Sequence, residues 1–279
     1  MERRILLPTD FSKNAQNAMD YAINLYKDEV CEFCILNTYE IEPYTMELTA
    51  IRDLKKSKRK SNIGLIHVLK RLLNTNKVTN HKFHIISECG SLISVIKEVV
   101  DKRDIDMVIM GTKGGTNSKI EIYGTQTVLA MEKIRNCPVL AVPKKATFKG
   151  IKEIIFPTDY KTNFKRREFQ HLVDIAEITK SAIRILHISV KDKSLNEDQL
   201  NNQILLKSYF ERLEYSFHTV NDTEVQKAIN VFIKTRDGDM VVFINKKHNF
   251  LESILFKPMV KNLGYHSKIP VLALHDLRN

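Results

Sequence analysis

The chain has 279 residues, 43% hydrophobic and 28% charged, a composition that excludes a disordered, collagen-like or linker-dominated chain. At roughly 100–200 residues per domain, this length predicts two modest domains or one large one. No apolar run approaches the roughly 18 residues of a membrane span, and the first residues lack the apolar stretch of a secretory signal, so we expect a cytoplasmic protein. The four cysteines are too few for a disulfide framework, which fits a reducing compartment.

The chain is basic, with 44 Lys and Arg against 33 Asp and Glu, a net charge of +11. This excess favours phosphates, acidic partners or nucleic acid. The densest basic stretch spans residues 52–60, where Asp53 is the one acid and no aromatic residue is available to stack on a base. A solvated helix face or a loop is the ordinary interpretation of this stretch, and nucleic-acid binding is the weakest of the alternatives.

Strands and helices alternate in the first half of the chain. Short runs of apolar, often branched residues, bounded by turn formers, predict strands at 5–8, 33–38, 83–87, 105–110 and 139–142. Between them, 14–26 and 92–100 place apolar residues at helical spacing. Such alternation indicates crossover units, and therefore a parallel sheet with helices on both faces.

The second half repeats the first. Residues 4–11 return at 153–160, 35–37 at 185–187, 106–110 at 239–243 and 138–142 at 270–274. Four matches in the same order indicate two copies of one module, with strands expected in the second copy at 154–157, 183–188, 215–219, 240–244 and 271–274. The predicted fold is therefore two tandem doubly wound α/β domains, 1–145 and 150–279, each with a five-stranded parallel sheet flanked by helices.

Open parallel sheets bind ligands at the carboxyl ends of their strands, where the strand order reverses. Asp10 follows the first predicted strand, Thr38 ends the second, and the glycine-rich segment 110–115 follows the fourth. Glycines allow tight turns and close backbone approach, and successive amides form an anion-binding concavity. Farther along, 124–126 precedes a helical stripe, whose start offers unpaired amides to an anion. The segment is neither a Walker A motif nor a dinucleotide fingerprint.

The full spacing Gly111-x2-Gly114-x9-Gly124-Thr125 is more specific than glycines alone. With Pro8-Thr9-Asp10 and the terminal strand at 137–142, the first copy resembles a universal stress protein domain of the ATP-binding kind, which has the adenine nucleotide α-hydrolase-like fold. The second copy resembles the same family by its strands, so the chain is similar to a tandem member.

The resemblance implies a site for ATP, with Mg²⁺ or Mn²⁺, in the first copy. Adenine would lie against Asp10 and the backbone near Thr38, beside Pro8 and Thr9. The ribose and α-phosphate would lie by Met110 and Gly111, and the phosphates would lie by Gly114, Gly124, Thr125 and Gln126. The charge of Lys113 adds a possible phosphate partner within the loop. ADP, AMP or a cyclic nucleotide remain open as ligands.

Two plainer interpretations stand beside this site. Asp10 follows a strand and precedes a helix, where Asp commonly caps the helix. The glycines are also compatible with tight turns that hold no ligand.

The second copy departs from the motif. The positions that correspond to Gly111, Gly114, Gly124 and Thr125 hold Ile244, Lys247, Lys257 and Pro258. A branched side chain at the first turn, and a proline where an amide donor is needed, make nucleotide binding in the same pose unexpected there.

Other candidate sites are weaker. Cys31 and Cys34 have the spacing of a redox or zinc pair, but they lie in or beside an apparent strand, where residues three apart face opposite sides, so ordinary packing is expected. Asp104 and Asp106 indicate a polar loop rather than a metal site. Neither a Gly-x-Ser-x-Gly elbow nor a His-Glu-x-x-His motif is present, so we predict no catalytic residues and no metal ligands.

The first hypothesis is a nucleotide-dependent regulator of a stress response that hydrolyses ATP slowly at most, because no base to activate water is evident. The alternative is a nucleotide-free interaction or assembly module with a protein partner. The last strands, 139–142 and 271–274, are apolar edges that a monomer must cover. The family commonly pairs this edge, so we expect the two copies to pair within one chain, with a homodimer as a further step.

Overall fold

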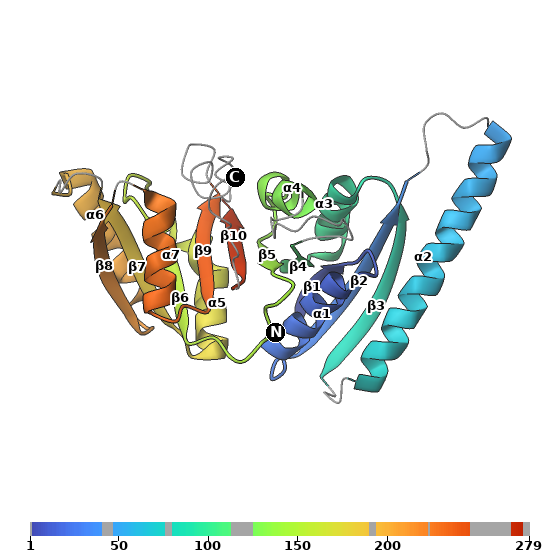
Figure 1. The fold of residues 1–279 in the computed structure, drawn as a ribbon, viewed down its shortest axis with the longest axis horizontal. Helices are drawn as coiled ribbons and strands as arrows, with labels where there is room; N and C mark the ends of the chain where they lie inside the picture. The colour runs from blue at the N-terminus through green and yellow to red at the C-terminus, as the bar shows by residue number, and fades with distance from the viewer. Residues whose placement is uncertain are drawn as a thin grey trace. The chain divides into compact units, whose positions relative to one another are not determined.

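The computed structural model describes residues 2–40, 47–75, 80–112, 125–189, 194–222, 224–245 and 269–275. The chain divides into two compact units, Met1–Thr147 and Phe148–Asn279, called unit 1 and unit 2 below (Figure 1).

Unit 1 is a doubly wound α/β domain (Figure 1). Its elements, in chain order, are β1 (Arg3–Pro8), α1 (Lys13–Leu25), β2 (Cys31–Tyr39), α2 (Glu47–Thr75), β3 (His81–Cys89), α3 (Leu92–Arg103), β4 (Met107–Gly111), α4 (Thr125–Lys133) and β5 (Val139–Val142). The strands pair in parallel in the order β3-β2-β1-β4-β5. Chain order reverses between β1 and β4, so the switch point lies there.

Unit 2 repeats this topology. Its elements are β6 (Glu153–Thr158), the 3₁₀ helix η1 (Arg166–Phe169), α5 (Gln170–Thr179), β7 (Ala182–Ser189), α6 (Glu197–Phe210), β8 (Tyr215–Asn221), α7 (Val225–Thr235), β9 (Met240–Asn245) and β10 (Val271–His275). The order is β8-β7-β6-β9-β10, again with parallel pairing. The predicted tandem doubly wound fold is therefore confirmed, whereas the pairing of the two copies stays a prediction.

The central strands form because their side chains are apolar on both faces. Ile5, Leu6 and Leu7 of β1 have no exposed surface, as expected for a strand covered by helices on both sides. The basic stretch at 52–60 lies on the first half of α2, so it is the solvated helix face that was expected.

One aspartate in each unit fixes where the first strand begins. Asp106 Oδ2 accepts a hydrogen bond from the backbone N–H of Arg4 at 2.7 Å. In unit 2, Asp239 Oδ2 accepts from the N–H groups of Lys152 and Glu153, at 2.7 and 3.1 Å. Asp106 is thus a structural group of the repeat, because its carboxylate binds the backbone of the first strand.

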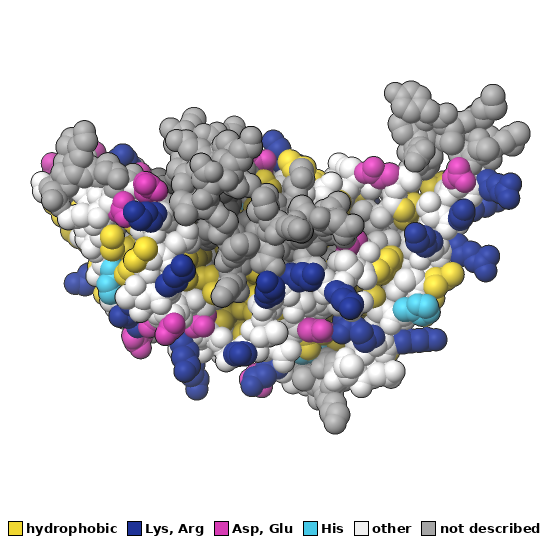
Figure 2. All heavy atoms as spheres, viewed as in Figure 1, with side chains coloured by type: hydrophobic (Ala, Val, Ile, Leu, Met, Phe, Trp, Pro, Cys, Tyr) yellow, Lys and Arg dark blue, Asp and Glu magenta, His cyan; other side chains and the backbone are white. Residues whose placement is uncertain are grey.

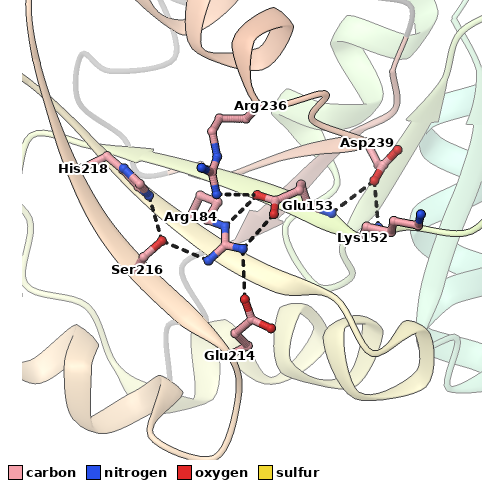
Figure 3. Close-up of polar contacts among 8 residues, drawn as sticks. All are labelled: Lys152, Glu153, Arg184, Glu214, Ser216, His218, Arg236 and Asp239. Carbon is pink, nitrogen blue, oxygen red and sulfur yellow. Dashed lines mark hydrogen bonds and ion pairs between the residues drawn. The ribbon is translucent and has the colours of Figure 1, made fainter.

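A largely buried ion-pair network holds the amino-terminal ends of the strands of unit 2 together (Figure 3). Arg184 of β7 donates from Nε and Nη2 to the two carboxylate oxygens of Glu153, at 2.6 and 2.7 Å. Its other contacts are with Glu214, at 3.0 Å, and with Ser216 Oγ, at 3.0 Å. The side chains of Arg184 and Glu153 are 10% and 19% exposed, so removing either partner leaves a charge with little access to water.

We expect Glu153→Gln to lower the free energy of unfolding by about 3 kcal/mol, because it leaves the Arg184 guanidinium without its bidentate partner. Urea denaturation at pH 7 measures this change. The matched control is Glu214→Gln, which removes a 74% exposed partner of the same arginine and should cost less than about 1 kcal/mol. Equal losses in the two variants would contradict this account.

The same pair predicts a pH dependence. Hydrogen bonds from Arg184 hold the pKa of Glu153 below its ordinary value, against the opposing effect of burial. Its contribution is therefore complete above the pKa of the unfolded chain and is lost as the pH falls through the lower pKa of the folded protein. The difference in unfolding free energy between wild type and Glu153→Gln should narrow in acid, and a difference that grows below pH 4 would contradict this.

Candidate functional site

A cleft of about 170 Å³ opens in unit 1 where the carboxyl ends of β1, β2 and β4 meet. This is the switch point of the sheet, the place where doubly wound folds bind their ligands. Its thirteen described lining residues are Pro8, Thr9, Asp10, Ser12, Asn14, Ala15, Asn37, Thr38, Leu92, Met110, Gly111, Gln126 and Thr127.

Side-chain oxygens shape the turn that follows β1. Thr9 Oγ1 accepts a hydrogen bond from Phe11 N, and Asp10 Oδ1 accepts one from Ser12 N, both at 3.0 Å. Phe11 adopts a φ of 65°, the left-handed region that a bulky residue rarely enters. The Phe11 ring lies so close to Gly64 of α2 that a Cβ there would be 2.4 Å from it, which secures the turn. The turn leaves the Asp10 carboxylate exposed at the cleft.

Ser12, not Asp10, caps the helix that follows. Ser12 Oγ accepts from Ala15 N at 3.2 Å, in the position of an N-cap. The capping interpretation of Asp10 is therefore wrong, because its carboxylate binds the amide of Ser12, outside the helix. The start of α1 lies against the cleft, which Asn14 and Ala15 line.

The end of β4 touches the first turn of α1. A Cβ at Gly111 would lie 2.8 Å from Asn14 Nδ2 and 2.9 Å from the Asn14 carbonyl oxygen. The backbone of Asn14 cannot move away without displacing the helix. Glycine at position 111 is therefore required by this close approach.

Hydrogen bonds also hold β2 and α4 in place beside the cleft. Asn37 Nδ2 donates to the carbonyl oxygen of Thr9 at 2.6 Å. Pairing between β1 and β2 ends at Pro8 and Leu36, so Thr38 extends beyond β1 at the edge of the cleft. Thr127 Oγ1 donates to the Gly111 carbonyl oxygen at 2.8 Å, which attaches the first turn of α4 to the end of β4.

The cleft brings together most of the predicted site. Seven predicted residues line it: Pro8, Thr9, Asp10, Thr38, Met110, Gly111 and Gln126. Thr125 begins α4, but its side chain is not described. Lys113, Gly114 and Gly124 lie outside the described residues.

Six lining residues were not predicted from the sequence: Ser12, Asn14, Ala15, Asn37, Leu92 and Thr127. Ser12 carried a usable signal, since serine just before an apolar helical stripe is typical of an N-cap. Asn37, a polar residue that follows Ile35 and Leu36 in a buried run, carried another.

Unit 2 keeps the turn after its first strand. Tyr160 N donates to Thr158 Oγ1 at 3.1 Å, Lys161 N donates to Asp159 Oδ1 at 3.0 Å, and Tyr160 has a φ of 55°. The strand end beside that turn differs from that of unit 1. Ile244, near the end of β9, occupies the position that Gly111 has in unit 1, and it is 8% exposed. Lys247, Lys257 and Pro258 lie outside the described residues.

Two side chains of α6 donate hydrogen bonds to backbone carbonyl groups of the turn in unit 2. Gln199 Nε2 donates to the Asp159 carbonyl oxygen, and Asn202 Nδ2 donates to that of Tyr160, both at 2.7 Å. The Tyr160 ring stacks on His187 with centroids 4.9 Å apart, and burial raises the pKa of Tyr160 to about 12. The helical segment after the turn also begins later, at Arg166, than α1 does in unit 1.

The cysteine pair of β2 has the character of core residues. Cys31 and Cys34 are fully buried and form no disulfide, and burial is the main cause that raises their pKa values to about 12 and 11. Thiols that stay protonated are poor nucleophiles and poor metal ligands. Among the described residues, no cluster of three or more His, Cys, Asp or Glu residues could hold a metal ion. No described helix is both long and apolar enough to cross a bilayer.

Fold and cleft together define a tandem doubly wound protein whose first unit opens at its switch point. The model of the Universal stress protein family matches residues 1–143. The chain therefore belongs to the universal stress protein family. It is also 27% identical over 151 residues to universal stress protein MJ0531 of Methanocaldococcus jannaschii, an alignment that covers 51% of this chain and 82% of that protein.

Solved structures share the tandem fold. A universal stress protein from Archaeoglobus fulgidus superimposes with a TM-score of 0.68 at 15% identity, covering 97% of both chains. Protein PA1789 of Pseudomonas aeruginosa matches with a TM-score of 0.55 at 14% identity, covering 98% of this chain and 92% of that one. At these identities the similarity shows the fold alone, and it extends over both units.

We expect Gly111→Ala to lower the free energy of unfolding by about 1–3 kcal/mol, because the new methyl group meets the backbone of Asn14. Chemical denaturation of the full chain measures the loss. An unchanged midpoint for Gly111→Ala would contradict the close approach.

Proposed function

We propose that unit 1 binds ATP, with Mg²⁺ or Mn²⁺, in the cleft at the switch point of its sheet. The chain then acts in the cytoplasm as a nucleotide-dependent regulator of a stress response. The observation that carries this proposal is the position of the cleft at the switch point, where the end of β4 at Gly111 meets the first turns of α1 and α4.

The described residues suit the two ends of a nucleotide. Asp10 uses Oδ1 for the turn, and Oδ2 remains to accept the amino group of adenine. Met110 is 5% exposed and offers apolar surface beside Gly111, where the ribose and α-phosphate would lie. At the far side, the first turn of α4, with Thr125 and Gln126, presents amides toward phosphates.

Three further residues complete the proposed phosphate site from the sequence. Gly114 and Gly124 would supply backbone amides, and Lys113 would supply positive charge. A divalent cation, when bound, neutralises negative charge on the phosphates.

The lining of the cleft supports slow hydrolysis at most. Asp10 is the one ionisable side chain among its described residues, and one of its oxygens already serves the turn. Activation of water needs a positioned base near the terminal phosphate, whereas Asp10 is assigned to the base end of the nucleotide. Binding, rather than turnover, is then the output of the site.

The alternative function is a nucleotide-free assembly module. The observation in its favour is unit 2, where Ile244 replaces the glycine and α6 side chains occupy the carbonyl groups of the turn. Equal partner binding with and without ATP would support this alternative over the first proposal.

We expect the purified chain to bind one ATP per molecule in isothermal titration calorimetry. Gly124→Val should abolish binding while the thermal midpoint stays within a few degrees, because a side chain would take the space of a phosphate. Lys247→Ala, in the counterpart segment of unit 2, is the matched control and should bind normally. No heat at millimolar ATP, or two sites per chain, would overturn the proposal.

A further inference from the structure

Exposed aliphatic side chains concentrate on two helices, α2 and α6. Eight large hydrophobic side chains are exposed among the described residues, and five of them lie on these helices: Ile63, Ile66 and Leu73 on α2, Leu200 and Ile204 on α6. Leu73 and Ile204 keep 60% and 64% of their surface exposed. One such residue is ordinary, whereas several on one helix face indicate an interaction surface.

The outward face of α2 combines these aliphatic residues with positive charge. Buried residues such as Leu65 and Leu72 pack the helix against β2 and β3. At 100° per residue, Lys56, Ile63 and Lys70 lie on the opposite side, away from the sheet. Figure 2 shows Lys and Arg side chains along this helix, with hydrophobic side chains among them. The exposed cations are Arg52, Lys55, Lys56, Lys58, Arg59, Lys60 and Lys70.

The outward face of α6 has the opposite charge. Its inward side is buried through Asn202, Leu206 and Phe210. On the other side lie Glu197, Leu200, Ile204 and Glu211, all exposed, with Glu211 at the C-cap. Helix α6 is the counterpart of α2 in the repeat, since each follows the second strand of its unit.

The two faces match in spacing as well as in charge. Lys70 lies fourteen positions after Lys56, and Glu211 lies fourteen positions after Glu197. Each span is about 21 Å of helix, and each encloses two exposed aliphatic residues. In an antiparallel alignment the opposed pairs are Lys56 with Glu211, Ile63 with Ile204, and Lys70 with Glu197, while Ile66 and Leu200 lie one residue out of register with each other.

We propose that the outward face of α2 in one copy of the chain docks antiparallel on the outward face of α6 in a second copy. The four charged side chains have no ion-pair partner within the described part of the chain, so they are available for this contact. Ion pairs at the ends fix the register, and the central aliphatic side chains leave water on association.

The mixture of cations and aliphatic residues on α2 favours the acidic face of α6 over other anionic partners. Nucleic acid would use the cations without the aliphatic residues, and α2 has no aromatic side chain to stack on a base. A lipid surface would attract the cations whatever their order along the helix. The contact joins two unlike faces. Two copies can therefore form a closed dimer with two such contacts, or many copies can form an open chain with one such contact between neighbours.

Sedimentation velocity of the full chain over a concentration series tests the proposal. Two variants reverse one face each: Lys56→Glu with Lys70→Glu, and Glu197→Lys with Glu211→Lys. Each should weaken self-association at least about tenfold, because attraction at both ends becomes repulsion. An equimolar mixture of the two variants should associate as the wild type does, since each then presents faces complementary to the other.

The control variant reverses two exposed lysines on other helices, Lys97 of α3 and Lys234 of α7, to Glu. It changes the net charge as much as the first variant does and should associate normally. A wild type that stays monomeric at low salt would overturn the proposal, as would a mixture that fails to associate. Failure of the mixture shows that the reversed residues do not face one another when the wild type associates. Association that survives both face reversals would overturn it too.

Discussion

The cleft of unit 1 depends on the close approach of Asn14 to Gly111, where even a methyl group would lie within 2.9 Å of the helix backbone. This contact places the start of α1 beside the end of β4 at the cleft. The left-handed turn at Phe11 makes the approach geometrically possible, because it redirects the chain from β1 into the helix. Ser12 then caps the helix at that point. Asp10 supplies the one ionisable side chain among the described residues that line this space.

The repeat separates what the fold requires from what the cleft requires. Both units keep the Thr-Asp turn with the same two hydrogen bonds, and both keep the aspartate that fixes the start of the first strand. Those groups therefore serve folding in each copy. Glycine at the end of the fourth strand is retained in unit 1 and replaced by Ile244 in unit 2. The two units share the Thr-Asp turn but differ at the end of the fourth strand. This difference is the reason that we expect the two units to bind ligands differently.

Sequence patterns predicted the strands well because central strands are apolar on both faces, and residues 5–7 and 33–36 show this without structural help. The strand ends at Asp10, Thr38 and Gly111 then located the cleft through the general rule for parallel sheets. Contacts between residues far apart in the chain produce no recognisable pattern in the sequence. Thr127 reaches the carbonyl of Gly111, and Glu153 pairs with Arg184, where the first copy has Arg4 and Cys34. These pairings depend on geometry that a single sequence does not encode locally.

We propose that nucleotide enters unit 1 at the end of β4 and does not enter the equivalent place in unit 2. Titration with ATP and Mg²⁺, followed through the backbone amide chemical shifts residue by residue, distinguishes the two units. We expect saturable shifts at Thr9, Asp10, Gly111 and Gln126, with the amides of Thr158, Asp159 and Ile244 unmoved. Shifts confined to the second set, or none at all, would contradict it.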